Sequence, residues 1–262
     1  MLEYFALVTR ALRFWTRIDL PILPFEIDPH APPVMNELVP AVPVAGAVIG
    51  LAGAFVLLVG TGLGLPTLLT ASFAVIALIL VTGAMHEDGL ADVADAFGGG
   101  RSIEHKLEIM KDPRLGSFGV TALVMILFVR VGALAALLDL LGVWRCAAVL
   151  IAAAALARIA GLWPLHALAS ARSEGAGAAT GGLGFAPWRQ GALIGAGIAL
   201  VGGLLGVGFV LTALAFIVLS AAVWGMTRLA DRHIGGYTGD VCGAATILAE
   251  TAFLAATLIH IW

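Results

Sequence analysis

The sequence predicts an all-α, polytopic integral membrane protein with about seven transmembrane helices and an N-terminal interfacial helix. Apolar residues make up 61% of the 262 residues and charged residues only 12%, whereas a soluble domain carries about 25% charged residues. The mean hydropathy is +1.04. Long uncharged runs recur along the chain, and each is long enough to cross the hydrocarbon core of a bilayer. We therefore expect one membrane-embedded domain over residues 1–262.

Length places the individual spans, since about 20 apolar residues cross the bilayer. The uncharged block from Gln190 to Met226 is too long for one helix, because at about 1.5 Å per residue it would far exceed the ~30 Å core. We divide it near Gly206 and Gly208. The predicted spans cover residues 41–60, 64–83, 117–140, 146–168, 190–207, 209–227 and 241–261.

The distribution of lysine and arginine predicts the orientation, because cytoplasmic loops of membrane proteins carry an excess of basic residues. One face holds only Arg145 outside the spans. The other face collects Arg10, Arg13, Arg17, Arg101, Lys106, Lys111, Arg114, Arg172, Arg189, Arg228 and Arg232. We expect the N-terminus and the loops 84–116, 169–189 and 228–240 in the cytoplasm, the protein in the cell (inner) membrane, and the C-terminus outside.

The net charge and the N-terminal segment argue against a nucleic-acid partner and against a cleavable signal peptide. The formal net charge of −3, with no basic tail, argues against a nucleic-acid partner. The first long apolar run begins near Ala41, too late for a cleavable signal peptide. Before it, residues 1–40 comprise an amphipathic stretch, EYFALVTRALRFWTRI, and a proline-rich segment. In the amphipathic stretch Arg10, Arg13 and Arg17 share one helical face, which predicts an interfacial helix on the cytoplasmic leaflet.

An acidic segment, HEDGLADVADAFGGG, separates two of the predicted spans. Asp88, Asp92 and Asp95 are spaced i, i+4, i+7, which stacks three carboxylates on one side of a helix. Like charges at this spacing repel, and a divalent cation removes that cost. Oxygen ligands beside substrate phosphates favour Mg²⁺. From the spacing alone, a solvated acidic loop explains the segment equally well.

Two later segments add the other half of a phosphoryl-transfer site. RSIEHKLEIMKDPRLGSFGV surrounds Asp112 with basic side chains, and GGYTGDVCGA places Thr238 and Asp240 in a glycine-rich turn. Acids that hold a metal beside bases that neutralise phosphate are what phosphoryl transfer requires.

Three ionisable residues fall inside the predicted spans. Glu250 is a functional candidate by its position alone, since an intramembrane charge is costly. Arg130 and Arg158 are expected to face the interior of the bundle or to pair with a buried acid.

These motifs resemble the cobalamin synthase family of adenosylcobinamide-GDP ribazoletransferases. The matching segments are FWTRIDLP, HEDGLADVADAFGGGR, LEIMKDPRLGSFGV and GGYTGDVCGA with the trailing Glu250. They follow the order of the family and span nearly the whole chain. The family more often has leucine in place of Glu87, which puts a role for Glu87 in doubt. It more often has serine in place of Pro113, which argues against the need for a hydroxyl at that position.

The resemblance implies a Mg²⁺-dependent late step of cobalamin (vitamin B12) biosynthesis. In that step α-ribazole or its 5′-phosphate attacks the pyrophosphate of adenosylcobinamide-GDP and GMP leaves. It implies Asp88, Asp92 and Asp95 as ligands of the metal. The remaining candidates are His86, Lys111, Asp112, Arg114 and Asp240 for catalysis, and Arg17, Gly98, Gly99, Gly100, Arg101 and Thr238 for substrate binding.

Two alternatives remain open. An alcohol phosphotransferase of phospholipid synthesis also uses spaced aspartates, with a CDP-linked donor. Its usual signature has two aspartates before the DG and an alanine-arginine pair after it, whereas here DGLAD follows Met85-His86-Glu87 and no such arginine is present. A cation-coupled transporter would place acids near several span centres, whereas most acids here lie in loops. The sequence does not decide whether the protein forms a homo-oligomer.

Overall fold

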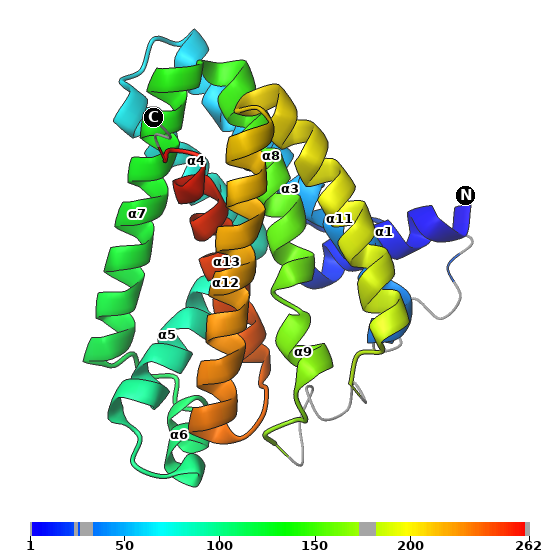
Figure 1. Ribbon diagram of the computed structural model, residues 1–262, viewed down its shortest axis with the longest axis vertical. Coiled ribbons are helices and arrows are strands. Elements are labelled where there is room, and N and C mark those ends of the chain that lie inside the picture. Colours follow the sequence, from blue (N-terminus) through cyan, green and yellow to red (C-terminus); the bar gives the residue numbers. More distant parts are fainter. Residues whose placement is uncertain (1, 24–25, 27–33, 173–181, 260–262) are drawn as a thin grey trace.

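The computed structural model describes residues 2–23, 26, 34–172 and 182–259. It is a bundle of long helices with shorter helices at its lower end (Figure 1). The elements in chain order are α1 (Leu2–Trp15), α2 (Met35–Leu38), η1 (Val39–Ala41), α3 (Val42–Gly62), α4 (Thr67–Thr82), α5 (Met85–Gly99), α6 (Ile103–Ile109), α7 (Ser117–Leu141), α8 (Val143–Ala160), α9 (Trp163–Ala167), α11 (Phe185–Gly206), α12 (Phe209–Ile234) and α13 (Gly239–Ala256). The predicted all-α class is confirmed.

The transmembrane helices lie where they were predicted. Within the described ranges, six helices are long and apolar enough to cross a membrane, or seven if α4 and α5 count as one broken span. The division of the 190–227 block is also confirmed, because α11 and α12 are separated at Val207 and Gly208, and Gly208 has a φ of +81°. Residues 260 and 261 of the last predicted span lie outside the described residues.

Two of the predicted loops are largely helical. The segment 84–116 contains α5 and α6. Helix α12 continues to Ile234, so only residues 235–238 separate it from α13. The extension is amphipathic: Met226, Ala230 and Ile234 are buried, with basic side chains on the exposed face. This apolar stripe binds the end of α12 to α13 although the segment is too charged to be predicted as a span.

The structure describes only part of the predicted loop 169–189. Helix α11 begins at Phe185, so Arg189 lies inside its first turns. Residues 173–181 of that loop lie outside the described residues.

Helix α8 forms the centre of the bundle. Its residues from Ala152 to Ile159 are all buried, and it packs against α3, α7, α11 and α13. Small side chains allow helices in a membrane to approach closely. At Gly46 of α3, for example, an added Cβ would lie only 2.7 Å from the carbonyl oxygen of Ala154. The alanine-rich sequence of α8 therefore permits neighbours on every side.

A sharp bend separates α4 from α5. Two consecutive residues at the break, Gly83 and Ala84, have left-handed φ angles of 65° and 59°, and the helix axes turn by 88°. Glycine adopts this conformation freely, whereas alanine does so at a cost. The bend directs α5 away from the axis of α4 and against α7 and α13, at the lower end of the bundle (Figure 1).

Helix α1 crosses the bundle instead of running along it (Figure 1). It buries Ala11, Leu12 and Trp15 against the protein, mainly α2, η1 and α3, while Leu2 and Phe5 are exposed. The predicted N-terminal helix is confirmed, but it ends at Trp15, so Arg17 does not extend the basic helical face that was predicted.

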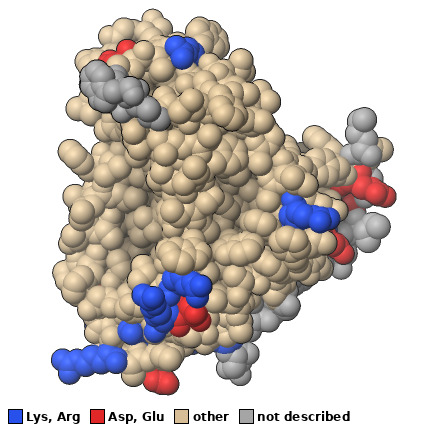
Figure 2. Space-filling view, viewed as in Figure 1, with Lys and Arg blue, Asp and Glu red and all other residues tan. Residues whose placement is uncertain are grey.

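Charged side chains gather at the margins of the molecule. On the face in Figure 2, a cluster of basic and acidic side chains lies at the lower end, further charged side chains lie at the top and on the right flank, and the central surface between them is uncharged. Figure 1 places α5 and α6, the connection after α9 and the α12–α13 turn at that lower end, with the last described residues near the opposite end. The three motif segments thus share one end of the bundle, as the charge count predicted.

This arrangement predicts the membrane topology. A reporter fused after residue 262 should be located outside the cytoplasm, and a reporter inserted in segment 173–181 should be inside. Paired phosphatase and fluorescent-protein fusions measure both locations. A cytoplasmic C-terminus would contradict the seven-span topology.

Candidate functional site

The acidic helix and the last transmembrane helix meet at two glycines. An added Cβ on Gly89 of α5 would lie 2.8 Å from the carbonyl oxygen and 3.1 Å from the Cα of Asp240 at the start of α13. Gly243 of α13 faces the backbone of Met85 and His86, with a nearest approach of 3.4 Å. Only glycine at position 89 allows this contact without displacement, and the contact brings the α5 acids beside Asp240.

Three carboxylates from these two helices form an acidic cluster, Asp88, Asp92 and Asp240. Helix α5 is not one of the six spans, Asp88 is exposed and Asp92 is half-buried. Burial, and then the charges of Asp88 and Asp240 with that of Asp95, raise the pKa of Asp92 to about 7. The neighbouring carboxylates therefore destabilise the charged form of Asp92, and a bound cation would reverse that effect.

Asp95 has a different set of partners. Its two carboxylate oxygens accept hydrogen bonds from the backbone N–H groups of Gly116 (2.7 Å) and Gly119 (2.8 Å) at the start of α7. A carboxylate at a helix N-terminus satisfies unpaired N–H groups and complements the helix dipole. Because added Cβ atoms at both glycines would lie within 2.4 Å of this carboxylate, Asp95 also explains the glycines of LGSFG. The metal role predicted for Asp95 stays a prediction, and the structure shows that its carboxylate also bonds the start of α7.

Asp112 pairs with its neighbour Arg114. The guanidinium donates to both carboxylate oxygens, at 2.9 Å from Nε and 2.6 Å from Nη2, in a largely exposed pair. These hydrogen bonds lower the pKa of Asp112 to about 2. Arg101 and Lys111, which lie before and after α6, are also exposed. The contacts described for Asp112 thus engage it with Arg114 and not with the acidic cluster.

The glycine-rich turns have structural causes. Gly98, Gly99 and Gly100 end α5, and an added Cβ at Gly100 would lie 2.3 Å from the Lys106 side chain as the chain turns into α6. Thr238 is the N-cap of α13, since its hydroxyl accepts a hydrogen bond from the N–H of Val241. The roles in substrate binding predicted for these residues stay predictions.

A short strand-like pairing between the chain after α9 and Tyr237 lies next to Asp240. The N–H of Ala171 donates to the carbonyl of Tyr237, and the N–H of Tyr237 donates to the carbonyl of Ala169, each at 2.9 Å. This pairing brings Arg172 to Asp240, with Nη2 and Oδ2 3.3 Å apart. Arg172 was counted from the sequence only as a basic loop residue, because nothing in the sequence links positions 68 residues apart.

Four buried charged side chains lie next to the acidic cluster, in the interior of the bundle. Arg130 of α7 donates to Glu87 of α5 at 2.8 Å and also to Glu250 of α13, and Glu250 accepts a further hydrogen bond from Arg158 of α8. We call these four residues the buried ion network. Two carboxylates and two guanidinium groups balance, and the network joins α5, α7, α8 and α13.

The network decides three sequence predictions. Arg130 and Arg158 do face the interior and pair with buried acids, as predicted. The resemblance put a role for Glu87 in doubt, and the structure gives its carboxylate a structural contact, because it is buried and bonded to Arg130. Glu250, the acid on which a cation-coupled transporter would depend, is neutralised by two arginines.

A cavity of about 280 Å³ adjoins the acidic cluster. Asp88, Asp240 and His86 line it together with apolar and aromatic side chains that include Trp15 and Tyr237. His86 therefore lies at the cavity, as its predicted role requires.

Arg17 lies outside this lining. Its side chain packs against Gly83 at the α4–α5 bend, and its N–H donates to the carbonyl of Val81 at 2.7 Å. The structure thus gives Arg17 a position at the bend.

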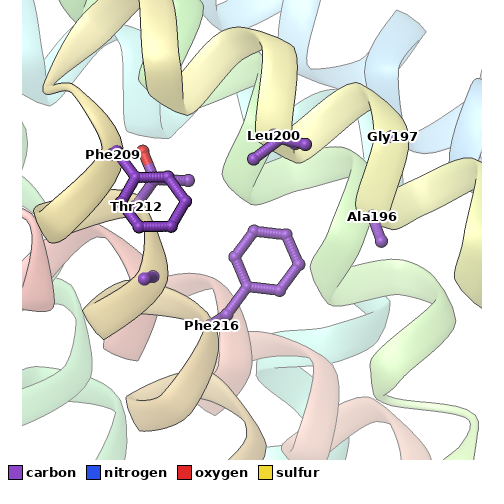
Figure 3. Close-up of a pocket in the computed structure, with 7 residues that line it drawn as sticks. Ala196, Gly197, Leu200, Phe209, Thr212 and Phe216 are labelled. Atoms are coloured by element: carbon purple, nitrogen blue, oxygen red, sulfur yellow. The ribbon is translucent and has the colours of Figure 1, made fainter.

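Another hollow, of about 290 Å³, lies between α11 and α12, where Leu200, Phe209 and Phe216 face one another (Figure 3). Its lining is apolar apart from the hydroxyl of Thr212, and that hydroxyl donates to the carbonyl of Gly208. It holds no titratable group and is not a candidate for the chemistry.

Comparison with known proteins agrees with these motifs. The sequence model of the family described as cobalamin-5-phosphate synthase matches residues 7–258. The chain is 50% identical to the adenosylcobinamide-GDP ribazoletransferase of Azorhizobium caulinodans, over 97% of this chain and 95% of that protein. It is 44% identical to the protein of the same name from Xanthobacter autotrophicus, over 95% and 94% of the two chains. No solved structure matches the chain.

The close contact between α5 and α13 predicts unequal effects of two alanine substitutions. Gly89→Ala should push α5 away from the Asp240 backbone and lower the catalytic rate by about tenfold or more, since small displacements in such sites are costly. Gly243→Ala, in the same interface, has room for its methyl group and should retain near-normal activity. Turnover of the purified variants, matched for the amount inserted in the membrane, measures both. Equal activity of the two variants would contradict the proposed contact.

Proposed function

The chain belongs to the cobalamin-5-phosphate synthase family, and on that premise we propose that it is an adenosylcobinamide-GDP ribazoletransferase of late cobalamin biosynthesis. The match over residues 7–258 is the observation that carries the proposal. The position of the motif acids supports it, because Asp88 and Asp240 line one cavity although they lie far apart in the sequence.

The proposed reaction is an in-line phosphoryl transfer. A ribose hydroxyl of α-ribazole, or of its 5′-phosphate, forms a P–O bond to the phosphorus nearest the cobinamide. The P–O bond between this phosphorus and the oxygen bridging to GMP breaks, and GMP leaves with the bonding electrons. The hydroxyl proton passes to a carboxylate of the protein. The products are adenosylcobalamin, or its 5′-phosphate, and GMP.

We assign the proton transfer to Asp240. It lines the cavity with Asp88, lies in the first turn of α13 and is oriented by Arg172. A base must lie within hydrogen-bond reach of the proton that it takes. Asp112, the other acid predicted for this role, is held by Arg114 instead.

The exposed basic side chains at the same end would bind the phosphates. Arg101, Lys111 and Arg114 carry positive charge at the surface near the end of α5 and after α6. Positive charge beside a pyrophosphate stabilises the charge that develops on the departing GMP.

We propose Mg²⁺ as the cofactor, held by Asp88 and Asp92. Within the described residues, no group of three His, Cys, Asp or Glu side chains is arranged to hold a metal ion. Mg²⁺ does not require one, since it is commonly bound by one or two carboxylates, waters and substrate phosphates. The oxygen-only donors and the mutual repulsion of the acidic cluster fit such an ion. When bound, Mg²⁺ would neutralise charge on the pyrophosphate.

We also propose that the site faces the cytoplasm from the inner membrane. The excess of lysine and arginine at the end of the bundle that carries the site supports this orientation. The substrates would then reach the acidic cluster from the aqueous phase, beside the membrane surface.

The proposal predicts the effect of neutralising the cluster. Purified protein supplied with adenosylcobinamide-GDP, α-ribazole 5′-phosphate and Mg²⁺ should release GMP, and chelation of the metal should stop it. Asp88→Asn and Asp92→Asn should each lower this rate by about 10²-fold or more, because each removes charge from the transition-state environment.

Asp139→Asn is the matched control. Asp139 is exposed near the far end of α7, where it accepts a hydrogen bond from Thr67 at 2.7 Å. Its variant should retain the rate of the unmodified protein. A wild-type protein that releases no GMP under these conditions would refute the proposed function, and full activity of Asp92→Asn would refute the role of the cluster.

A further inference from the structure

The cavity beside the acidic cluster has an apolar part and an acidic part. Trp15, Leu162 and Leu165 line it and are buried, each with 7% or less of its surface exposed. Asp88 is exposed, and the Asp240 side chain is 24% exposed. These three apolar side chains are thus more deeply buried than the two carboxylates, while the apolar Phe14 and Met85 line the exposed part of the cavity. A ligand in this cavity would have a buried apolar group and a polar group at the acids.

The walls are contributed by segments that are distant in the sequence. Trp15 ends α1 and is held by an edge-to-face contact with Phe14, with ring centroids 4.6 Å apart. Leu162 precedes α9 and Leu165 lies within it. A rigid aromatic side chain beside two leucines is a typical surface for a flat ring system.

The size of the cavity restricts the ligand. At about 280 Å³ it lies just below the range of about 300–1,000 Å³ for pockets that hold small molecules. It is suited to a bicyclic aromatic ring and is far too small for a corrin macrocycle. Three groups in the two proposed substrates are flat rings of this size: the ribazole base, guanine, and the adenine of the adenosyl ligand.

The chemistry of the walls favours the ribazole base. Guanine presents a carbonyl, a ring N–H and an amino group at its edges, and adenine presents an amino group and several ring nitrogens. Burying these groups without partners costs free energy. The ribazole base is a benzimidazole, which is mostly carbon. Among the buried wall residues, Trp15, Leu162 and Leu165 offer mostly carbon surface. The buried polar side chains of the wall are His86, Tyr237 and Thr246, and the Thr246 hydroxyl already donates to the carbonyl of Cys242.

We propose that this cavity binds the aromatic base of the nucleoside acceptor and so directs a ribose hydroxyl toward Asp88 and Asp240. The proposal rests on the proposed function for the identity of the acceptor. Base binding and proton acceptance then occur in one cavity, with the base against Trp15 and Leu165 and the sugar at the carboxylates.

Direct binding to the purified full-length protein tests the assignment, with α-ribazole alone and GMP alone as the probes. Leu165→Trp fills the cavity and should weaken α-ribazole binding by at least about tenfold, while GMP binding changes by less than about twofold. Leu200→Trp, in the groove between α11 and α12, is the control and should change neither. Weakened binding of GMP instead of α-ribazole, or unchanged binding of both, would overturn the proposal.

A fluorescence measurement keeps the test independent of variants that fold poorly. α-Ribazole should quench the tryptophan emission of the wild-type protein and of Trp144→Phe, which alters an exposed residue at the start of α8. Trp15→Phe should lose most of this quenching, and full quenching in that variant would overturn the proposal. A wild-type protein that binds α-ribazole but releases no GMP contradicts the proposed function alone. Normal turnover with unaltered binding in Leu165→Trp contradicts the base site alone.

Discussion

The buried ion network is the interaction on which the rest of the site depends. Removing four charges from water is expensive, and only their mutual pairing and hydrogen bonds offset that cost. Because the charges are contributed by α5, α7, α8 and α13, the network is complete only when these helices take their observed positions. It lies directly next to the acidic cluster along α5, since Glu87 precedes Asp88. The network thereby fixes α5, whose axis turns by 88° from that of α4, against the bundle.

Much of this arrangement could be predicted from the sequence. Hydropathy and length placed the spans, including the break between α11 and α12 at Gly208, and the i, i+4, i+7 spacing predicted that the acids of α5 lie on a helix. The cost of intramembrane charge predicted that Arg130 and Arg158 are paired. These features follow from local sequence or from the cost of placing charge in a membrane, so they can be predicted from a single sequence.

The remaining features depend on contacts between distant segments. The spacing of Asp95 matched that of a metal ligand, but the structure attaches its carboxylate to the N-terminus of α7. Arg172 reaches Asp240 only because the chain after α9 pairs with Tyr237. Glu87 seemed dispensable by resemblance, yet its carboxylate bonds to a buried arginine. Periodicity reports which face a residue occupies and not which partner it meets there.

The stability of Arg130 variants tests the central claim most directly. Arg130→Met leaves the buried Glu87 carboxylate without its partner and should lower the free energy of unfolding by about 3 kcal/mol or more, with loss of activity. Adding Glu87→Leu removes the unpaired charge while Glu250 keeps Arg158, so the double variant should be more stable than Arg130→Met alone. Thermal unfolding of the purified proteins in detergent measures this difference. A double variant that loses the sum of the two single losses would contradict the account.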